Sequence, residues 1–479
     1  AHYTRGLVLA GQNATEDAAA AMDRAIALKA DPRFRLARAG LMPIVAPSET
    51  AIRRWRRAFE EGFDALIADG VRIDQFPPPA SAMTFHMTYQ GENDRDLFAK
   101  VGRFYAQACP DLSWTAPQLR GTRPGRARRR IGLVSHYLGE HAVAATLIGL
   151  LQELPRESME LVLFPVGTDN LAAEIRATAD GVVPLTEGLR KARERIAEAD
   201  CDILLYSDIG MHAVSYWLAF ARLAPVQCAI WGHPDTTGLG SIDYFISNDL
   251  AEPADAQDHY VERLIRLDGV QTCYRRPHLS ADPKARADFG LPGAATLYLC
   301  PQSLFKLHPA MDPAFATILR GDPGGRLVLF AHPAREVTAA LIRRLGEAMP
   351  DAADRIQILP RVRFADFLNV MALADVVLDT WPFGGGNTSY QAIALGRPHV
   401  TLPHRFIRGR GTWALYRHMD LLDCVAADAG DYARIALELG RDPIRHAAVS
   451  SAIRERGAVV FDDRRVVRSL ARFLQEVPL

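Results

Sequence analysis

The sequence has no surplus of charge of either sign, because its 479 residues include 56 Lys and Arg and 56 Asp and Glu. Such a chain creates no overall field that attracts nucleic acid or an anionic membrane surface. It also lacks any apolar run near the roughly 20 residues that a membrane-spanning helix needs. Its first residues, AHYTRGLVLAG, lack the ordered regions of a signal peptide. We therefore expect a cytoplasmic protein with no membrane span and no nucleic-acid partner.

Cysteine is also scarce, and no cysteine stands in a redox or zinc-binding motif. The sequence contains no CxxC pair and no Cys–His spacing that suits zinc. We therefore expect buried free thiols in a reducing compartment. The six cysteines are Cys109, Cys201, Cys228, Cys273, Cys300 and Cys424.

What is present is the composition of an ordinary globular protein, with 49% apolar and 23% charged residues. A chain of this length is too long for one hydrophobic core, so two or three domains are expected. Residues 1–118 are predicted to be a helical region. Within it, SETAIRRWRRAFEEGFDALIAD has the periodicity of an amphipathic helix, with Ser48 as its N-cap.

The first 70 residues are rich in alanine and match a tetratricopeptide unit in part. The match predicts helix–helix contacts at four positions, although a generic helical hairpin is the alternative. These positions are Leu7, Ala20, Ala27 and Pro32.

After an arginine-rich segment at 120–130, which we interpret as a solvated linker, strands alternate with helices. One series occupies 128–280 and a second occupies 290–465, and a last helix is predicted over 466–479. Such alternation is typical of parallel sheets covered by helices. Two successive sheets of this kind predict two Rossmann-like domains that face a cleft, where the C-terminal ends of the strands converge.

The stretch VVLDTWPFGGGNTSYQAIALG predicts a strand that ends at Asp379, a glycine-rich turn and a helix that ends at Gly396. Glycines before a helix let the backbone approach a ligand closely, and the first N–H groups of the helix then point toward an anion. This geometry suits a diphosphate. The same pattern also serves a tight strand–helix connection that binds nothing.

Polar residues stand in four loops at predicted strand ends, where ligands bind in such sheets. Each has a structural alternative: a lone loop histidine is often a hydrogen-bonded structural residue, and a loop lysine is often a surface charge. Their placement at the same edge of two sheets favours a site. The candidates are His136 and His141; His233, Asp235, Thr236 and Thr237; Gln302, Ser303 and Lys306; and Gly384, Gly385, Gly386, Asn387 and Thr388.

Four blocks of sequence, in the expected order, resemble the protein glycosyltransferases of family 41. This family includes the O-GlcNAc transferases, the SPINDLY-type proteins and the bacterial adhesin N-glucosyltransferases. The resemblance covers roughly residues 85–475. The blocks are MTYQGENDRDLFAKVGRFYAQACPDL, RLAPVQCAIWGHPDTTGLGSIDYFISND, SLFKLHP and LADVVLDTWPFGGGNTSYQAIALGRPHVTLP.

The resemblance implies a GT-B fold and a nucleotide-sugar co-substrate, with no other cofactor and no bound metal. Lys306 matches a lysine that contacts the donor diphosphate, with Gln302 and Ser303 on the same loop. His141 matches a histidine near the acceptor and the sugar, and His233 matches the Tyr or His of the family's Gly-(Tyr/His)-Pro-x-Thr turn. The resemblance implies catalytic roles for Lys306, His141 and His233. Three residues beside His233 are expected on the sugar and acceptor side: Asp235, Thr236 and Thr237. Donor binding is implied for Gly385, Gly386, Asn387, Thr388, Val362, Phe367 and Arg410.

One position departs from the family pattern. The family usually has a carboxylate four residues after the position of Asn387, where it binds the ribose hydroxyls of the donor, and this chain has Gln391. An amide oxygen can still accept a hydrogen bond but lacks charge-assisted strength. The departure leaves the donor open, either UDP-GlcNAc or UDP-glucose, or a CMP-linked nonulosonic acid.

The expected reaction is transfer of a sugar to a Ser, Thr or Asn side chain of a bacterial protein such as a flagellin or an adhesin. The helical region would select this acceptor. The alternatives are a nonenzymatic scaffold built on the same domains and a sugar-nucleotide epimerase of similar architecture. A scaffold has no need of Lys306, Asn387, Thr388 and His141 together, and an epimerase has no need of an acceptor-selecting helical arm.

Overall fold

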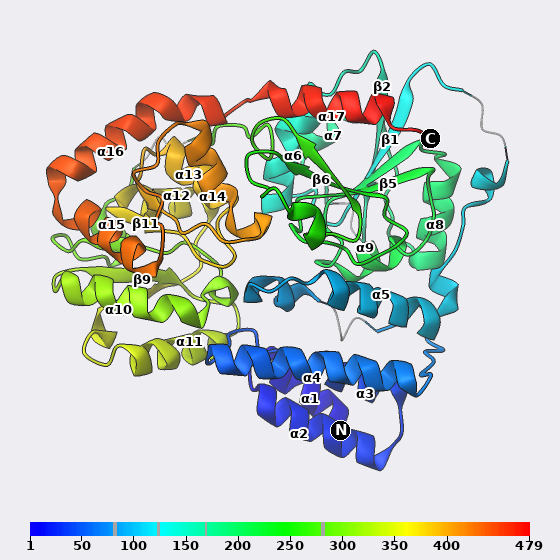
Figure 1. Cartoon of the computed structure of the whole chain (residues 1–479), viewed down its shortest axis with the longest axis horizontal. Coiled ribbons are helices and arrows are strands. Elements are labelled where there is room, and N and C mark those ends of the chain that lie inside the picture. Colours follow the sequence, from blue (N-terminus) through cyan, green and yellow to red (C-terminus); the bar gives the residue numbers. More distant parts are fainter. Residues whose placement is uncertain (80–83, 122–124, 168–169, 279–282) are drawn as a thin grey trace.

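The computed structural model describes residues 1–79, 84–121, 125–167, 170–278 and 283–479. They form a helical region and two parallel sheets covered by helices, as Figure 1 shows. The predicted α/β architecture is therefore confirmed. Residues 122–124 of the predicted linker and residues 279–282, at the junction between the two predicted strand–helix series, lie outside the described residues.

The helical region lies below both sheets in Figure 1. Ser48 caps the longest helix as predicted, because its Oγ accepts a hydrogen bond from the N–H of Ala51 at 3.1 Å. Trp55, Phe59 and Phe63 recur every four residues along this helix and are buried. The helices are α1 (His2–Gly11), α2 (Thr15–Leu28), α3 (Pro32–Ala39), α4 (Glu49–Ala68) and α5 (Arg95–Ala108), with 3-10 turns η1 (Phe85–Gln90), η2 (Pro110–Leu112) and η3 (Pro117–Arg120).

The contact positions predicted from the tetratricopeptide match are wrong. Helices α1 and α2 do pack against each other, but they meet through Gly6 and Met22, and a Cβ atom on Gly6 would lie 2.7 Å from Met22 Cγ. The close approach is at Gly6, so the consensus counted from Leu7 selects positions that point away from this contact. The predicted contacts are all exposed: Leu7, Ala20, Ala27 and Pro32.

The first sheet has the strand order β3-β2-β1-β4-β5-β6-β7, and its neighbouring strands are parallel. The chain reverses its direction of winding between β1 and β4, so the loops after these two strands border a crevice. The strands are β1 (Arg129–Ser135), β2 (Met159–Pro165), β3 (Gly181–Val182), β4 (Ile203–Tyr206), β5 (Val226–Ile230), β6 (Tyr244–Asn248) and β7 (Arg263–Leu267). The helices are α6 (Ala142–Glu153), α7 (Ala173–Arg176), α8 (Leu189–Glu198) and α9 (Ala213–Leu218), and η4 spans Ala256–His259.

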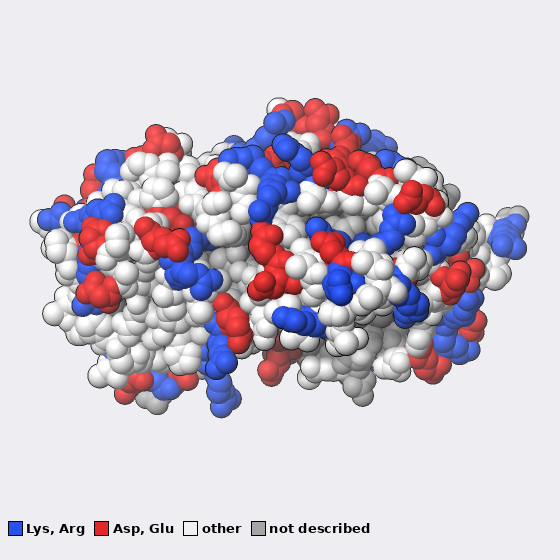
Figure 2. All heavy atoms as spheres, turned by 90° about the horizontal axis from the view of Figure 1, so that it is seen from below, with Lys and Arg blue, Asp and Glu red and all other residues white. Residues whose placement is uncertain are grey.

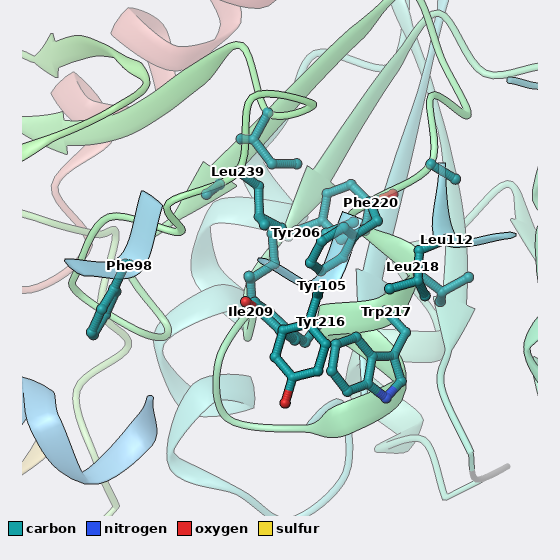
Figure 3. Packing of buried hydrophobic residues seen from close by; sticks show 14 of the residues in the cluster. Phe98, Tyr105, Leu112, Tyr206, Ile209, Tyr216, Trp217, Leu218, Phe220 and Leu239 are labelled. Atoms are coloured by element: carbon teal, nitrogen blue, oxygen red, sulfur yellow. The ribbon is translucent and has the colours of Figure 1, made fainter. Parts of the chain in front are cut away.

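The helical region and the first sheet share one hydrophobic core. Figure 3 shows Tyr105 of α5 among Tyr216, Trp217 and Phe220, and the rings of Tyr105 and Trp217 have centroids 4.8 Å apart. Tyr206 of β4 belongs to the same buried cluster. Because each aromatic side chain buries a large apolar area, this contact fixes α5 on the sheet.

The second sheet has the order β10-β9-β8-β11-β12, again parallel, and its winding reverses between β8 and β11. Its strands are β8 (Leu297–Leu299), β9 (Arg326–Phe330), β10 (Ile356–Leu359), β11 (Val376–Leu378) and β12 (His399–Val400). Its helices are α10 (Asp312–Gly321), α11 (Arg335–Ala348), α12 (Phe364–Leu373), α13 (Asn387–Ala394), α14 (Gly411–His418), α15 (Ala429–Arg441) and α16 (Pro443–Arg456). The 3-10 turns are η5 (Arg286–Phe289), η6 (Leu304–Lys306), η7 (Pro309–Met311), η8 (Ala353–Arg355), η9 (Ile407–Gly409) and η10 (Gly457–Val460).

The last helix, α17 (Arg464–Glu476), returns to the first sheet across the top of Figure 1. Its Val466, Leu470 and Leu474 are buried in the same cluster as Ile131 and Leu133 of β1. The end of the chain therefore packs on the first of the two sheets.

All six cysteines are buried, and none of them forms a disulfide with a described residue, as predicted. Within the described ranges, no helix combines the length and apolar character needed to cross a bilayer. The face of the molecule seen in Figure 2 carries basic and acidic side chains in small mixed groups, consistent with the balanced composition.

Candidate active site

The two loops expected to bind the donor diphosphate lie at the point where the second sheet reverses its winding. Lys306 ends η6 after β8, and the glycines 384–386 follow β11. Strands β8 and β11 are paired neighbours, so their C-terminal loops border one crevice. The fold thus brings Lys306 into contact with Gly384, 78 residues later in the chain.

Lys306 points at the glycine loop. Its Nζ donates hydrogen bonds to Gln302 Oε1 at 3.0 Å and to the carbonyl oxygen of Gly384 at 3.1 Å. It also lies 4.6 Å from the ring centroid of Phe383. Burial lowers the pKa of Lys306 to about 8, although the nearby Asp379 carboxylate acts in the opposite direction. The ammonium group therefore lies beside the loop, and no carboxylate of the described residues contacts it directly.

Helix α13 begins at Asn387, with Gly386 as its N-cap. The N–H groups of Gly386, Asn387 and Thr388 belong to the first turn and have no partner inside the helix. Gln302 Nε2 donates to Thr388 Oγ1 at 2.8 Å, which ties the lysine loop to the start of this helix. The helix end therefore offers N–H groups and a positive partial charge next to Lys306.

Gly385 differs from the prediction. Its N–H donates to Asp379 Oδ1 at 2.6 Å, so this amide is not free for a phosphate. Its role is close packing, because a Cβ atom there would lie 2.6 Å from Ser389 Oγ and from Thr388 Oγ1. Asp379 also accepts from the hydroxyls of Thr401 and Thr412, so one buried carboxylate holds the glycine loop in place.

The side chain of Asn387 joins the two sheets. Its Nδ2 donates to the carbonyl oxygen of Ala142 at 3.0 Å, and its Oδ1 accepts from the hydroxyl of Tyr274 at 2.8 Å. Any contact of Asn387 with a phosphate therefore falls to its backbone. Gln391, one turn further along α13, is buried, and its Oε1 has no hydrogen-bond partner among the described residues.

A small cavity of about 10 Å³ adjoins the glycine loop on the side of the first sheet. Asn248 and Gln271 line it from one side, and Gly385, Gly386 and Tyr390 from the other. Two buried polar atoms of its lining, Asn248 Nδ2 and the Tyr390 hydroxyl oxygen, lack hydrogen-bond partners in the described part of the chain. The space between the two sheets is therefore polar where the donor diphosphate is expected.

His141 is the N-cap of α6, directly before the Ala142 carbonyl that Asn387 contacts. Its Nδ1 accepts from the N–H of Val143 at 3.2 Å, and its ring stacks on Tyr137 at 4.1 Å. Loss of hydration, together with nearby His136, lowers the pKa of His141. In the neutral ring the proton then sits on Nε2, so His141 presents a donor rather than a base.

His136 itself is held by the first sheet. Its Nδ1 lies 2.7 Å from the carbonyl oxygen of Val166, and its ring is parallel to that of His212 at 3.8 Å. His136 is therefore a hydrogen-bonded residue at the end of β1. The ring of Tyr137 contacts both His136 and His141.

His233 and Asp235 are buried rather than open to the cleft. His233 Nε2 lies 3.3 Å from Thr88 Oγ1, and burial lowers the pKa of His233 to about 4. Asp235 Oδ1 contacts Arg408 at 3.2 Å, and Arg408 contacts Asp94 of the helical region at 3.0 Å. Burial raises the pKa of Asp235 well above its usual range. These residues form a buried contact between the helical region, the first sheet and the second sheet, which we call the joint.

The two threonines beside Asp235 also turn inward. The hydroxyl of Thr236 donates to Glu262 Oε2 at 2.7 Å, and Thr237 donates to the same carboxylate through its N–H at 2.8 Å. A sugar or acceptor would have to displace a buried carboxylate to reach them. The expected contact of Asp235, Thr236 and Thr237 with the acceptor therefore has no support in this geometry.

Arg410 lies at the contact between the two sheets, not on the glycine loop. It donates to the carbonyl oxygens of Ala251 and His404, and its guanidinium lies 4.0 Å from the ring centroid of Trp413.

Ser303 is exposed at the start of η6. Val362 is half-buried in the loop after β10, and the Phe367 ring lies 5.4 Å from Phe330. Val362 therefore follows the end of β10, and Phe367 lies near the end of β9.

Three residues at the site were not predicted: Tyr274, which holds Asn387, Asp379, which anchors the glycine loop, and Phe383, which lies under Lys306. Asp379 had a signal in the sequence, because it directly follows a buried strand that leads into the glycines. Tyr274 had none, since it stands in the connection between the two sheets.

Comparison with known proteins identifies the family. Residues 279–469 match the model described as Glycosyl transferase family 41. A Solanum lycopersicum protein named "Probable UDP-N-acetylglucosamine–peptide N-acetylglucosaminyltransferase SPINDLY" is 28% identical over 274 residues, which are 56% of this chain and 29% of that protein. The Arabidopsis thaliana protein with the same activity name and the designation SEC is 24% identical over 412 residues, 79% of this chain and 41% of that protein. Residues 279–469 belong to glycosyltransferase family 41.

The chain also resembles solved structures. A mutant of the Thermobaculum terrenum O-GlcNAc transferase matches with a TM-score of 0.71 and 25% identity, over 99% of this chain and 90% of that one. Anabaena HepE, solved with UDP and glucose, matches with a TM-score of 0.50 and 13% identity, over 73% of this chain and 100% of that one. The GT-B fold is therefore confirmed. The chain spans less than half the length of the SPINDLY and SEC relatives.

Proposed function

We propose that this chain transfers a sugar from a nucleotide donor to a protein side chain, with UDP-GlcNAc or UDP-glucose as the favoured donor. The observation that carries the proposal is the position of Lys306 beside the free N–H groups of the first turn of α13. The names of the SPINDLY and SEC relatives and of the Thermobaculum terrenum enzyme support the donor class.

In the proposed reaction, an acceptor atom attacks C1 of the sugar while the bond between C1 and the diphosphate oxygen breaks. The electron pair of that bond leaves with the diphosphate, which gains negative charge. A cation and helix-end amides fixed in advance stabilise such a leaving group. Lys306 and the backbone of Gly386, Asn387 and Thr388 supply both, so the proposed chemistry assigns no step to a metal ion.

The acceptor proton has two possible destinations, a protein base or the departing diphosphate. With Nδ1 of His141 engaged by Val143, the neutral ring carries its proton on Nε2. We therefore assign His141 to orienting the acceptor, and the diphosphate to taking the proton. His233 is assigned to the buried joint, because it contacts Thr88 there.

The acceptor is proposed to be a cytoplasmic protein, such as a flagellin or adhesin, modified on Ser, Thr or Asn and selected by the helical region. A second donor, a CMP-linked nonulosonic acid, is favoured by one observation. Gln391 presents a buried amide with an unpartnered Oε1 where the family resemblance calls for a carboxylate. A different sugar or nucleotide would suit this changed contact.

A thermal-shift titration tests the proposal. Wild type and Lys306→Ala would be titrated with UDP, CMP, GDP, UDP-GlcNAc and UDP-glucose. A ligand at 100 times its Kd adds about 2.7 kcal/mol of stability, which such an assay detects. We expect one pyrimidine nucleotide to stabilise the wild type and to lose its effect in the variant. No shift with any of the five ligands would contradict a donor site and favour the scaffold.

A further inference from the structure

A short segment of the helical region reaches the loops of the second sheet. This segment is η1, residues 85–90, and Gly91 ends it in the left-handed conformation at φ 80°. Only glycine fits there, because a Cβ atom on Gly91 would lie 2.7 Å from Pro382 Cγ, in the loop that leads to the glycines. The turn after η1 therefore packs closely against the donor side of the cleft.

The aromatic rings of η1 contact both loops that are expected to bind the donor. The ring of Tyr89 lies 4.8 Å from that of Phe305 and 4.5 Å from that of Phe383. Phe305 directly precedes Lys306, and Phe383 directly precedes Gly384. Segment η1 therefore adds an apolar wall to a site that holds one cation, Lys306, and the start of α13.

One polar side chain of this wall has no assigned role. His86 lies with its ring centroid 6.0 Å from that of Phe305, and its Nδ1 is buried without a hydrogen-bond partner in the described ranges. Burial lowers the pKa of His86 to about 4, and nearby His332 acts in the same direction. His332 follows β9, and its own Nδ1 accepts from the N–H of Ala334 at 3.1 Å.

The chemistry of this position suits a hydroxyl group better than a phosphate. A neutral imidazole offers one donor and one acceptor, whereas a phosphate calls for a cation or for several N–H groups. A buried polar atom without a partner is costly, so such an atom beside the loops expected to bind the donor indicates a ligand that completes its hydrogen bond. Pockets for small molecules combine apolar and aromatic walls with a few such polar groups.

We propose that His86 hydrogen-bonds the transferred sugar of the donor, so that the helical region contributes a specificity residue to the donor pocket. The inference rests on the proposed function. It goes beyond it by naming the residue that distinguishes the sugar from the bare nucleotide, and by giving the segment of residues 85–89 a role in donor binding rather than in acceptor binding.

Isothermal titration calorimetry with UDP and with UDP-GlcNAc tests the inference on wild type and His86→Ala. Loss of one hydrogen bond is expected to weaken UDP-GlcNAc binding about 5- to 10-fold. UDP lacks the sugar, so its affinity should change less than about twofold. His86→Asn keeps a neutral hydrogen-bonding group and should recover part of the loss, which a merely space-filling role would not explain.

His308→Ala serves as the matched control. His308 is also a histidine whose pKa burial lowers to about 4, and it stands two residues after Lys306, but its Nδ1 is engaged with the N–H of Ala310 at 3.2 Å. This variant should change the affinities for UDP and UDP-GlcNAc by the same factor. Equal changes for both ligands in His86→Ala, or no change for either, would overturn the inference while leaving donor binding intact. A wild type that binds neither ligand would overturn the proposed function as well.

Discussion

At the scale of single residues, Lys306 is the most informative side chain of the molecule. It donates to two neutral oxygens, those of Gln302 and Gly384, and no carboxylate in the described part of the chain neutralises it by direct contact. A buried ammonium in this state gains stability from an anion that enters beside it. Lys306 is therefore placed to bind a diphosphate, and its protonation state should control the affinity for that diphosphate.

The pH dependence of UDP binding tests this role. The pKa of Lys306 is lowered to about 8, so the ammonium that attracts the diphosphate is present below pH 8 and lost above it. UDP affinity should fall as pH rises from 7 to 10, approaching about tenfold per pH unit above the pKa. Lys306→Arg stays charged throughout and should show a flat profile. A flat profile in the wild type, measured by calorimetry, would count against the assignment.

Sequence reasoning placed Lys306 beside the glycine loop because both follow buried strands and precede helices. The sequence also favoured Asp235, Thr236 and Thr237 as acceptor-side residues, but their partners in the structure come from other parts of the chain. The two threonines donate to Glu262, 25 residues or more further on, and Asp235 contacts Arg408. The direction in which a loop side chain points depends on such distant partners, and nothing in the local sequence records them.

At the scale of elements, the connection between β11 and α13 is shaped by packing as much as by ligand chemistry. The N–H of Gly385 belongs to Asp379, and the space beside its Cα is filled by the hydroxyls of Thr388 and Ser389. The strand, turn and helix were predictable from β-branched residues, glycines and periodicity. The packing role of Gly385 could not be predicted, because a glycine-rich turn has the same sequence pattern whether it binds a phosphate or only connects a strand to a helix.

Gly385→Ala should therefore damage stability and UDP binding together. The added methyl group has no room, and overpacking of this kind costs about 1–3 kcal/mol. Gly346→Ala is the control, because Gly346 lies inside α11 with nothing within 4 Å of an added Cβ atom. That change should stabilise the protein by about 0.5–1 kcal/mol. Urea unfolding measures both, and equal effects from the two variants would show that the loop is not tightly packed.

At the scale of the whole molecule, three parts of the chain meet at one buried ion network. Arg408 comes from the second sheet, Asp235 from the first and Asp94 from the helical region, and Arg56 contacts Asp94 at 2.7 Å. Each carboxylate is at most 3% exposed. Together with the Asn387–Ala142 contact, this joint holds the cleft in the form described here.

Removal of Arg408 should loosen this joint. Arg408→Ala leaves Asp94 and Asp235 buried with one cation fewer, which costs about 3–5 kcal/mol. Arg434→Ala is the matched control, because the Arg434 side chain is 56% exposed and pairs only on the surface of α15. Its two ion pairs, with Asp431 and Glu438, should together be worth less than about 1 kcal/mol. Urea unfolding with similar losses for the two variants would contradict the importance of the joint.

The joint also predicts an acid response. The pKa of His233 is lowered by burial to about 4, with Arg408 acting in the same direction and Asp94 against it. The stability contributed by the neutral ring is present above the unfolded pKa of about 6.5 and is lost as pH falls toward 4. Wild type should lose up to about 1.4 kcal/mol per pH unit more than His233→Gln over this range. Parallel stability curves from pH 7 to 4 would show that His233 does not titrate as described.

The most direct test of the account is a crystal structure of this chain with UDP bound. The account predicts that the diphosphate lies between Lys306 and the first turn of α13. Its oxygens should be within about 3.2 Å of Lys306 Nζ and of the N–H groups of Asn387 or Thr388. A diphosphate bound elsewhere, with Lys306 still donating to Gln302 and Gly384, would contradict the central claim.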